Sequence, residues 1–378
     1  MASVKSLAFR TVISAAVAAA ISFFPRGSSC YEPGTEAEPS THPLLAQKSA
    51  KFYGAMNEGG NLGSPITDEQ MRQLMRGAIE EDEPFFRSFR HFTDWQTDKG
   101  IFVEGQYSSS KEWLHNEEEQ GRPNLGGNFT WERAARDHDY EALGHILHLI
   151  EDASVPAHVR NDIHPGLARF GLRDVDTART QREREWILRS YRLHGDGFEF
   201  WADQNNRALD QIFPAELPYF DTIDEIMDAM IQYTGRNFVS DDTAFTGYSL
   251  PARNQVFERR LGKKTYYYST IDGEEVAIAR KGFLVPYVLD NLVLADQSIR
   301  LFRKTTELGA AAILLFKKET ERLGECHSDV SRGCSDGDLY WFNSCGEREE
   351  IAEDCPPDAP CDPEACCDGP TVCHRKSF

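Results

Sequence analysis

The stretch His145-Ile-Leu-His148-Leu-Ile-Glu-Asp152-Ala-Ser-Val-Pro156-Ala-His158 places three imidazoles and two acids on a short, otherwise apolar segment. Pro156 is expected to end a helix that covers most of it. His148 and Asp152 are four residues apart, so both side chains leave the same face of that helix, and His158 follows its end. Burying such groups unpaired would be costly, whereas zinc binds them readily. Any single histidine here could be an ordinary core or surface residue, but the cluster predicts a metal site.

The size and composition of the chain indicate a folded protein. It has 378 residues, of which 40% are hydrophobic and 11% aromatic, so a substantial core can form and global disorder is excluded. The formal net charge of −20 disfavours simple electrostatic docking on DNA or on an anionic bilayer. It suits a protein that gathers carboxylates around cations.

The first 29 residues have the pattern of a signal peptide. Lys5 and Arg10 form a basic start, residues 11–24 form an apolar stretch too short to span a bilayer comfortably, and small residues follow. A membrane anchor is the alternative interpretation. We therefore predict export to the periplasm, the cell surface or the medium.

Cysteine usage agrees with export. Eight of the nine cysteines lie between Cys326 and Cys373, and the ninth is Cys30. An even cluster in an exported chain predicts disulfides, with Cys/His zinc binding as the rival interpretation. We expect a Cys-rich tail over residues 324–378, separate from a main domain over residues 30–323. Cys30 could be the lipidated first residue of a lipoprotein.

Helical periodicity dominates the main domain. Capping boxes at Thr67–Gln70 and Thr222–Glu225 mark the starts of two helices. The exception is a hairpin over residues 264–279 with a tight turn at Asp272-Gly273. We therefore predict an all-α fold with a small β-hairpin insertion. The expected helices cover residues 68–80, 131–153 with a break near Asp137, 181–194, 222–235 and 288–323.

The segment from Ala142 to Asp162 resembles the signature of the zinc-dependent phospholipase C family, which shares its helical fold with the fungal single-strand-specific nucleases. The His-x3-Asp-x5-His spacing, with proline two residues before the last histidine, matches in full. The resemblance implies a multi-helix bundle of that type. Supporting segments, spread over roughly residues 40 to 320, are Thr41-His42-Pro-Leu-Leu, Gly77 to Pro84 with His91 to Asp94, and Gly195 to Trp201.

The same resemblance implies three zinc ions. A first ion would take four side chains, and a second would share one of these and add a histidine with the amino group and carbonyl of the mature N-terminal residue. The third would take a histidine, a glutamate and one further histidine. The implied ligands are Asp82, His91, His148 and Asp152 for the first ion, Asp152 and His42 for the second, and His158 and Glu199 with His164 or His194 for the third.

Some assignments stay open. Asp82 is the implied general base, which would orient the attacking water, but it stands in an acidic run with Glu80 and Glu81. The mature chain could begin at Cys30 or Tyr31. His145 is interpreted as a residue that supports the ligands or packs beside them.

The activity implied by the resemblance is zinc-dependent hydrolysis of phosphoesters by a metal-activated water, most simply phospholipase C-like cleavage of phospholipids. The alternative of the same fold is a single-strand-preferring nuclease or 3′-nucleotidase. A zinc-stabilised extracellular binding protein is the alternative of another class. We expect phospholipid or another phosphoester as the partner, with peripheral contact to a membrane surface and no stable nucleic-acid complex.

Overall fold

The computed structural model describes residues 40–58, 62–101, 106–162, 197–212, 214, 216–240, 256–282, 287–324, 331–335, 338–342 and 348–353. The expected signal peptide, the expected helix over residues 181–194, and both His164 and His194 lie outside these residues. The chain divides into two compact units, residues 1–315 and 316–378.

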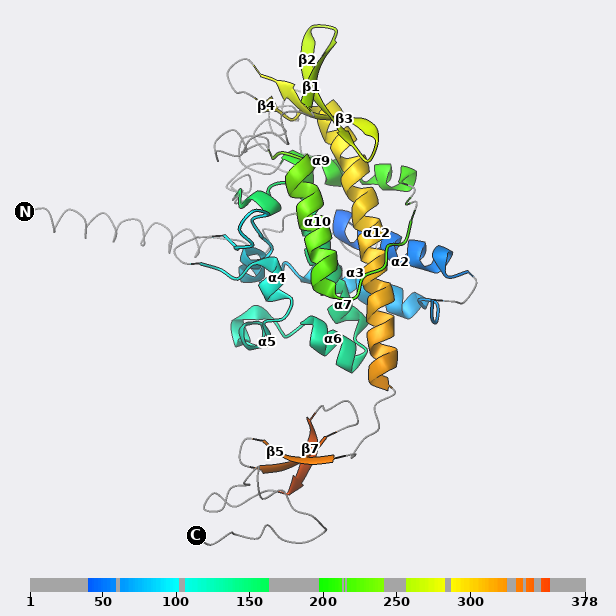
Figure 1. Cartoon of the computed structure of the whole chain (residues 1–378), viewed down its shortest axis with the longest axis vertical. Helices are drawn as coiled ribbons and strands as arrows, with labels where there is room; N and C mark the ends of the chain where they lie inside the picture. The colour runs from blue at the N-terminus through cyan, green and yellow to red at the C-terminus, as the bar shows by residue number, and fades with distance from the viewer. Residues whose placement is uncertain are drawn as a thin grey trace, which may run out of the picture. The chain divides into compact units, whose positions relative to one another are not determined.

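Helices make up most of the described part of the first unit (Figure 1). Within the described residues, none of them is long and apolar enough to cross a membrane. The α-helices are α2 (Thr41–Met56), α3 (Asp68–Glu80), α4 (Ser110–Trp113), α5 (Glu117–Gln120), α6 (Trp131–Asp137), α7 (Tyr140–Asp152), α9 (Gly197–Gln204), α10 (Ile223–Asn237) and α12 (Asn291–Gly324), which runs on into the second unit. Short 3₁₀ helices are η1 (Phe85–Arg90), η2 (Pro123–Leu125), η3 (His158–Arg160) and η6 (Asn206–Gln211).

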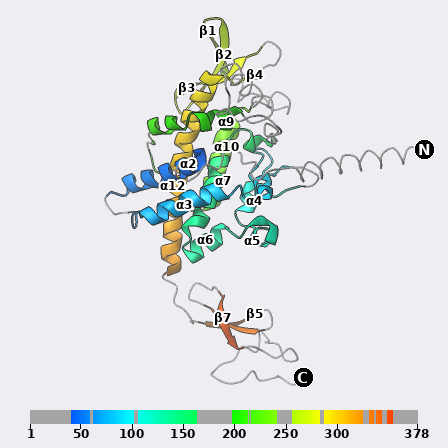
Figure 2. The same ribbon diagram turned by 180° about the vertical axis from the view of Figure 1, so that it is seen from behind.

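Helix α7 lies at the centre of the helical unit. Every residue from Ala142 to Asp152 is buried, as expected for a helix covered on all sides. Figures 1 and 2, which show opposite faces, place α3 on one side of α7 and α10 on the other. Helix α12 packs against both α2 and α7, since a Cβ atom on Gly309 would lie 2.4 Å from Oγ of Ser49 and 3.7 Å from the side chain of Leu147. The residues of the predicted metal site therefore lie in the core.

Two glycines allow α3 and α7 to approach closely. A Cβ atom on Gly77 would lie 1.9 Å from the carbonyl oxygen of Glu141, and one on Gly144 would lie 2.3 Å from that of Leu74. Both distances are far below van der Waals contact, so only glycine fits at this crossing.

The local helix signals are confirmed. Both predicted capping boxes are present, at the starts of α3 and α10. The break near Asp137 is also real, since His138 adopts a left-handed conformation with φ of 54°. Asp139 then accepts hydrogen bonds from two backbone N–H groups and begins α7.

The expected all-α fold is wrong. About 57% of the described residues are helical, and an antiparallel four-stranded sheet accompanies the helices. Its strands, in the order β1-β2-β3-β4, are β1 (Val256–Leu261), β2 (Lys264–Ile271), β3 (Glu274–Lys281) and β4 (Tyr287–Val288). The predicted hairpin is β2–β3, whose turn residues Asp272 and Gly273 have φ values of 52° and 80°.

The missed strands have a physical explanation. Along β1 the side chains are exposed on both faces apart from the half-buried Val256, so its sequence carries no alternation of apolar and polar residues. It is an edge strand, and its pairing with β2 defines it. Strand β4 has only two residues.

The second unit contains a three-stranded antiparallel sheet in the order β5-β6-β7. Its strands are β5 (Ser331–Ser335), β6 (Asp338–Phe342) and β7 (Arg348–Glu353). They fall in the tail for which the sequence predicted disulfides but no strands.

Candidate metal centre

Several separate segments of the chain bring polar side chains together beside α7. His148 and Asp152 come from α7 itself, His42 from α2, His158 from η3 and Glu199 from α9. The link between α3 and η1 adds Asp82, and His91 directly follows η1. All seven side chains are between 0% and 3% exposed. The structure therefore brings together every sequence-predicted site residue that it describes.

The carboxylate of Asp152 stands between four histidines. Its Oδ2 atom lies 2.6 Å from Nδ1 of His91 and 3.2 Å from Nε2 of His148. Its Oδ1 atom lies 3.4 Å from Nε2 of His42 and 3.6 Å from Nδ1 of His158. Each oxygen thus faces its own pair of imidazoles, which is the arrangement of a bridging carboxylate.

Three overlapping groups have ligand atoms close enough to share one ion. We call them the Asp82 cluster (Asp82, His91, His148), the His42 cluster (His42, His148, Asp152) and the Glu199 cluster (Asp152, His158, Glu199). Within each, the candidate ligand atoms lie within 4.8 Å of one another. Ligands about 2 Å from a tetrahedral zinc are separated by about 3–4 Å. Each cluster could therefore hold a metal ion.

The hydrogen-bond inventory of these side chains fits a metal. Oδ1 of Asp82, Nε2 of His148 and both carboxylate oxygens of Asp152 are buried without a hydrogen-bond partner. Buried polar atoms are nearly always satisfied, because leaving them unpaired is costly. A cation beside His91 and His148 would satisfy Oδ1 of Asp82, Nε2 of His148 and Oδ2 of Asp152, and a second cation beside His42 or His158 would satisfy Oδ1 of Asp152.

Hydrogen bonds behind two of the histidines fix which nitrogen faces the site. Nδ1 of His148 donates to the carbonyl oxygen of Ala78 at 2.8 Å, so its Nε2 presents a lone pair toward Asp82 and Asp152. Nδ1 of His42 lies 2.7 Å from Oε2 of Glu151, which leaves Nε2 facing Asp152. Partners of this kind orient histidine ligands in metalloproteins.

The close packing of these groups perturbs their ionisation. Burial raises the pKa of Asp82 to about 6. For Asp152, burial acts to raise the pKa, but His158, His148 and His91 outweigh it and hold the pKa well below its usual range. For His91, burial acts to lower the pKa, but Asp152 outweighs it and raises the pKa to about 10. Without metal, a proton on His91 therefore plays the balancing role that a cation would otherwise take.

The Glu199 cluster is linked to helix α2 by hydrogen bonds. Nε2 of His158 lies 3.0 Å from Oε1 of Glu199 on α9. One turn later on the same helix, Asp203 accepts hydrogen bonds from the backbone N–H and the hydroxyl of Thr41, at 3.3 and 2.6 Å. Since Thr41 precedes His42, this contact fixes the two ligand-bearing helices α2 and α9 against each other.

The structure shows which of the three acids at positions 80–82 faces the candidate site. Glu80 is the last residue of α3 and is exposed. Asp82 faces His91 and His148 at 3.5 and 3.8 Å. Glu81 is fully buried, and its Oε2 atom lies 2.6 Å from Nδ1 of His145. His145 belongs to none of the three clusters.

Sequence reasoning missed the roles of Glu81 and Glu151. Glu151 could have been suspected, because it lies three residues after His148 on a helix that proved buried throughout. Glu81 has no comparable local signal.

Together these features define a buried histidine and carboxylate centre that could hold metal ions. No protein-family model matches this chain, and the comparison with curated proteins finds no match.

Proposed function

We propose that this protein is an exported, zinc-dependent phosphoesterase of the phospholipase C-like type, with three zinc ions at the buried centre. The observation that carries the proposal is the sharing of Asp152 and His148 among three buried clusters. Sharing of this kind suits a multi-metal site rather than a single structural ion. The donor set of imidazoles and carboxylates is one that zinc favours.

The residues divide among the ions as the family resemblance implies. Asp82, His91, His148 and Asp152 would hold the first ion, and His42 and Asp152 with the mature N-terminal residue would hold the second. His158 and Glu199 with His164 or His194 would hold the third. When bound, the ions would acidify a water molecule and neutralise the phosphate oxygens of the substrate. Asp82, whose Oδ1 atom faces His91 and His148, would orient that water as well as bind metal.

Metal analysis and a two-substrate assay test the proposal. The purified protein would be offered phosphatidylcholine and single-stranded DNA side by side, with and without a chelator. We expect zinc in the protein and release of phosphocholine that the chelator abolishes. Cleavage of DNA alone would instead indicate the nuclease activity, and bound zinc without hydrolysis of either substrate would indicate a binding protein.

A pair of variants locates the activity. Asp152→Asn should lose zinc and hydrolysis together, because it removes the carboxylate that two clusters share. Asp290→Asn is the matched control, since Asp290 binds Lys264 and Arg280 beside the sheet and belongs to none of the clusters. Full zinc content and activity in Asp152→Asn would refute the proposed site.

A further inference from the structure

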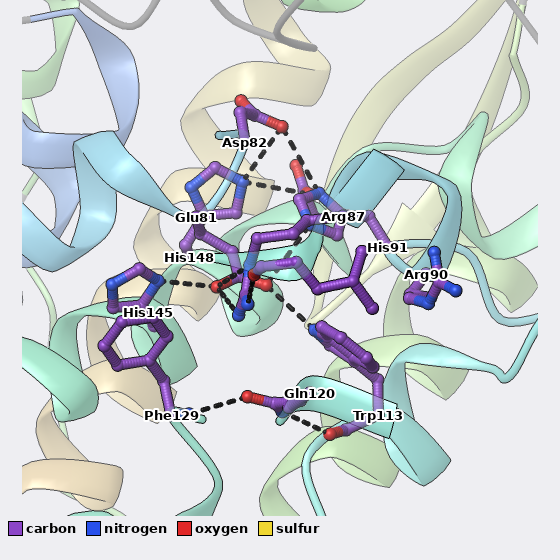
Figure 3. A network of polar contacts seen from close by, with 12 residues as sticks. Glu81, Asp82, Arg87, Arg90, His91, Trp113, Gln120, Phe129, His145 and His148 are labelled. Carbon is purple, nitrogen blue, oxygen red and sulfur yellow. Dashed lines mark hydrogen bonds and ion pairs between the residues drawn. The ribbon is translucent and has the colours of Figure 1, made fainter. Parts of the chain in front are cut away.

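Glu81 is a fully buried carboxylate directly beside Asp82, yet it belongs to none of the three clusters. Figure 3 shows it at the centre of a polar network with Arg87, Trp113, His145 and His91. Of these residues, only His91 has a role in the proposed function.

Four side chains fix the position of Glu81. Its Oε2 atom accepts hydrogen bonds from Nε and Nη2 of Arg87, at 3.1 and 2.6 Å, and lies 2.6 Å from Nδ1 of His145. Its Oε1 atom accepts a hydrogen bond from Nε1 of Trp113 at 2.9 Å and faces His91. Partners from η1, α4 and α7 thus hold one carboxylate in a single orientation.

Arg87 is itself firmly anchored. Its Nη1 atom donates to the backbone carbonyl oxygens of Leu125 and Gly127, at 2.7 and 3.1 Å. Its guanidinium also lies over the rings of Trp113 and Phe129, 4.9 and 5.1 Å from their centroids. The negative charge of Glu81 is therefore paired at a fixed place, as a buried charge requires.

The His91 ring connects this network to the metal-facing side chains. Its Nδ1 atom faces Asp152 and Asp82, whereas Nε2 lies 3.5 Å from Oε1 of Glu81. If Nδ1 binds a metal, the proton of the neutral ring must be on Nε2, a buried atom that has Oε1 of Glu81 3.5 Å away. Carboxylates in this position orient the ring and make it a better ligand.

We propose that Glu81 is a positioning residue. It accepts a hydrogen bond from the Nε2–H group of His91 and so presents the unprotonated Nδ1 atom to a metal in the Asp82 cluster. The inference rests on the proposed metal site. It adds that metal affinity depends on a residue that does not touch the metal, and that Arg87, Trp113 and His145 hold this residue in place.

The alternative is that Glu81 only stabilises the fold as the partner of Arg87. Glu119→Gln separates the two, because Glu119 is also paired with a largely buried arginine, Arg90, but contacts none of the cluster histidines. Both substitutions remove one charge from an arginine-paired glutamate. Only Glu81→Gln removes the negative charge that faces His91, because the amide oxygen that replaces the carboxylate is neutral and a weaker acceptor.

Zinc affinity, measured by competition with a chromophoric chelator and without any substrate, is the decisive readout. We expect Glu81→Gln to bind one of its zinc ions, the one in the Asp82 cluster, about 10- to 100-fold less tightly than the wild type. Glu119→Gln should stay within about twofold of the wild type even if its thermal midpoint falls equally. Wild-type affinity in folded Glu81→Gln would overturn the inference.

A second variant covers the case in which Glu81→Gln does not fold. Glu81→Asp keeps the charge for Arg87 but withdraws the carboxylate by about 1.5 Å, so the same loss of affinity is expected, and unchanged affinity would again overturn the inference. A wild-type protein that binds no zinc would overturn both this inference and the proposed function. A protein that binds zinc but hydrolyses no phosphoester would refute only the function, and the comparison of affinities would still decide the role of Glu81.

Discussion

Gly144→Ala tests the close crossing of α3 and α7. The added methyl would lie 2.3 Å from the carbonyl oxygen of Leu74 and 2.9 Å from Cα of Gly77, both backbone atoms that cannot rotate away. Restoring normal contact requires the helices to separate by about 1 Å. The hydrogen bond from His148 to Ala78, 2.8 Å long, crosses this same interface. Separation by that amount would break it.

The magnitude follows from three terms. Overpacking costs about 1–3 kcal/mol, and the lost hydrogen bond costs about 0.5–1.5 kcal/mol. Alanine in place of glycine inside a helix stabilises the folded state by about 1 kcal/mol. We therefore expect Gly144→Ala to lower the free energy of unfolding by about 2 kcal/mol, where helix propensity alone would raise it.

Urea unfolding of the metal-free protein measures this difference. Gly54→Ala is the matched control, because Gly54 also lies in a helix but a Cβ there would meet nothing within 4 Å. We expect the control to be as stable as the wild type or slightly more stable. If Gly144→Ala behaved like the control, the helix crossing would not be as tight as described.

Three further predictions concern stability. Arg87→Met should lower the free energy of unfolding by about 3–5 kcal/mol, because it leaves Glu81 buried without its cation, and a loss below about 1 kcal/mol in a urea titration would contradict this. In metal-free protein the pKa of His91 is raised to about 10, so protonated His91 contributes fully to the free energy of unfolding below pH 6.5. This contribution is lost as the pH rises toward 10, by up to about 1.4 kcal/mol per pH unit. Thermal midpoints from pH 7 to 10 should therefore fall without zinc, and a fall equally steep with zinc bound would refute the assignment of His91 as a ligand. Asp203→Ala should cost about 1–2 kcal/mol by removing both hydrogen bonds to Thr41, whereas an unchanged urea midpoint would show that this contact contributes nothing.

Local signals predicted a large part of the helical unit. The capping boxes that begin α3 and α10 involve residues three apart, so neither depends on the rest of the fold. The turn at Asp272-Gly273 is equally local. By contrast, β1 buries almost nothing and takes its conformation from pairing with β2, so its own residues gave no strand signal.

The candidate site divides in the same way. The sequence predicted that His148 and Asp152 lie on the same face of one helix, because they are four residues apart. In the structure, Nε2 of His148 lies 3.2 Å from Oδ2 of Asp152. The role of Glu81 could not be predicted in this way, because its partners Arg87 and Trp113 come from separate segments and meet only in the folded chain. An acidic residue that is fully buried by distant partners looks like any surface glutamate in the sequence.

The sharing of Asp152 also bears on how such a centre can evolve. A change at Asp152 or His148 alters two clusters together, so neither residue can be varied to adjust the preference of one ion alone. His42, Asp82, His91, His158 and Glu199 each belong to a single cluster and form the outer positions of the centre. Adaptation to a different metal or substrate would therefore have to proceed through these outer positions, while the central pair stays fixed.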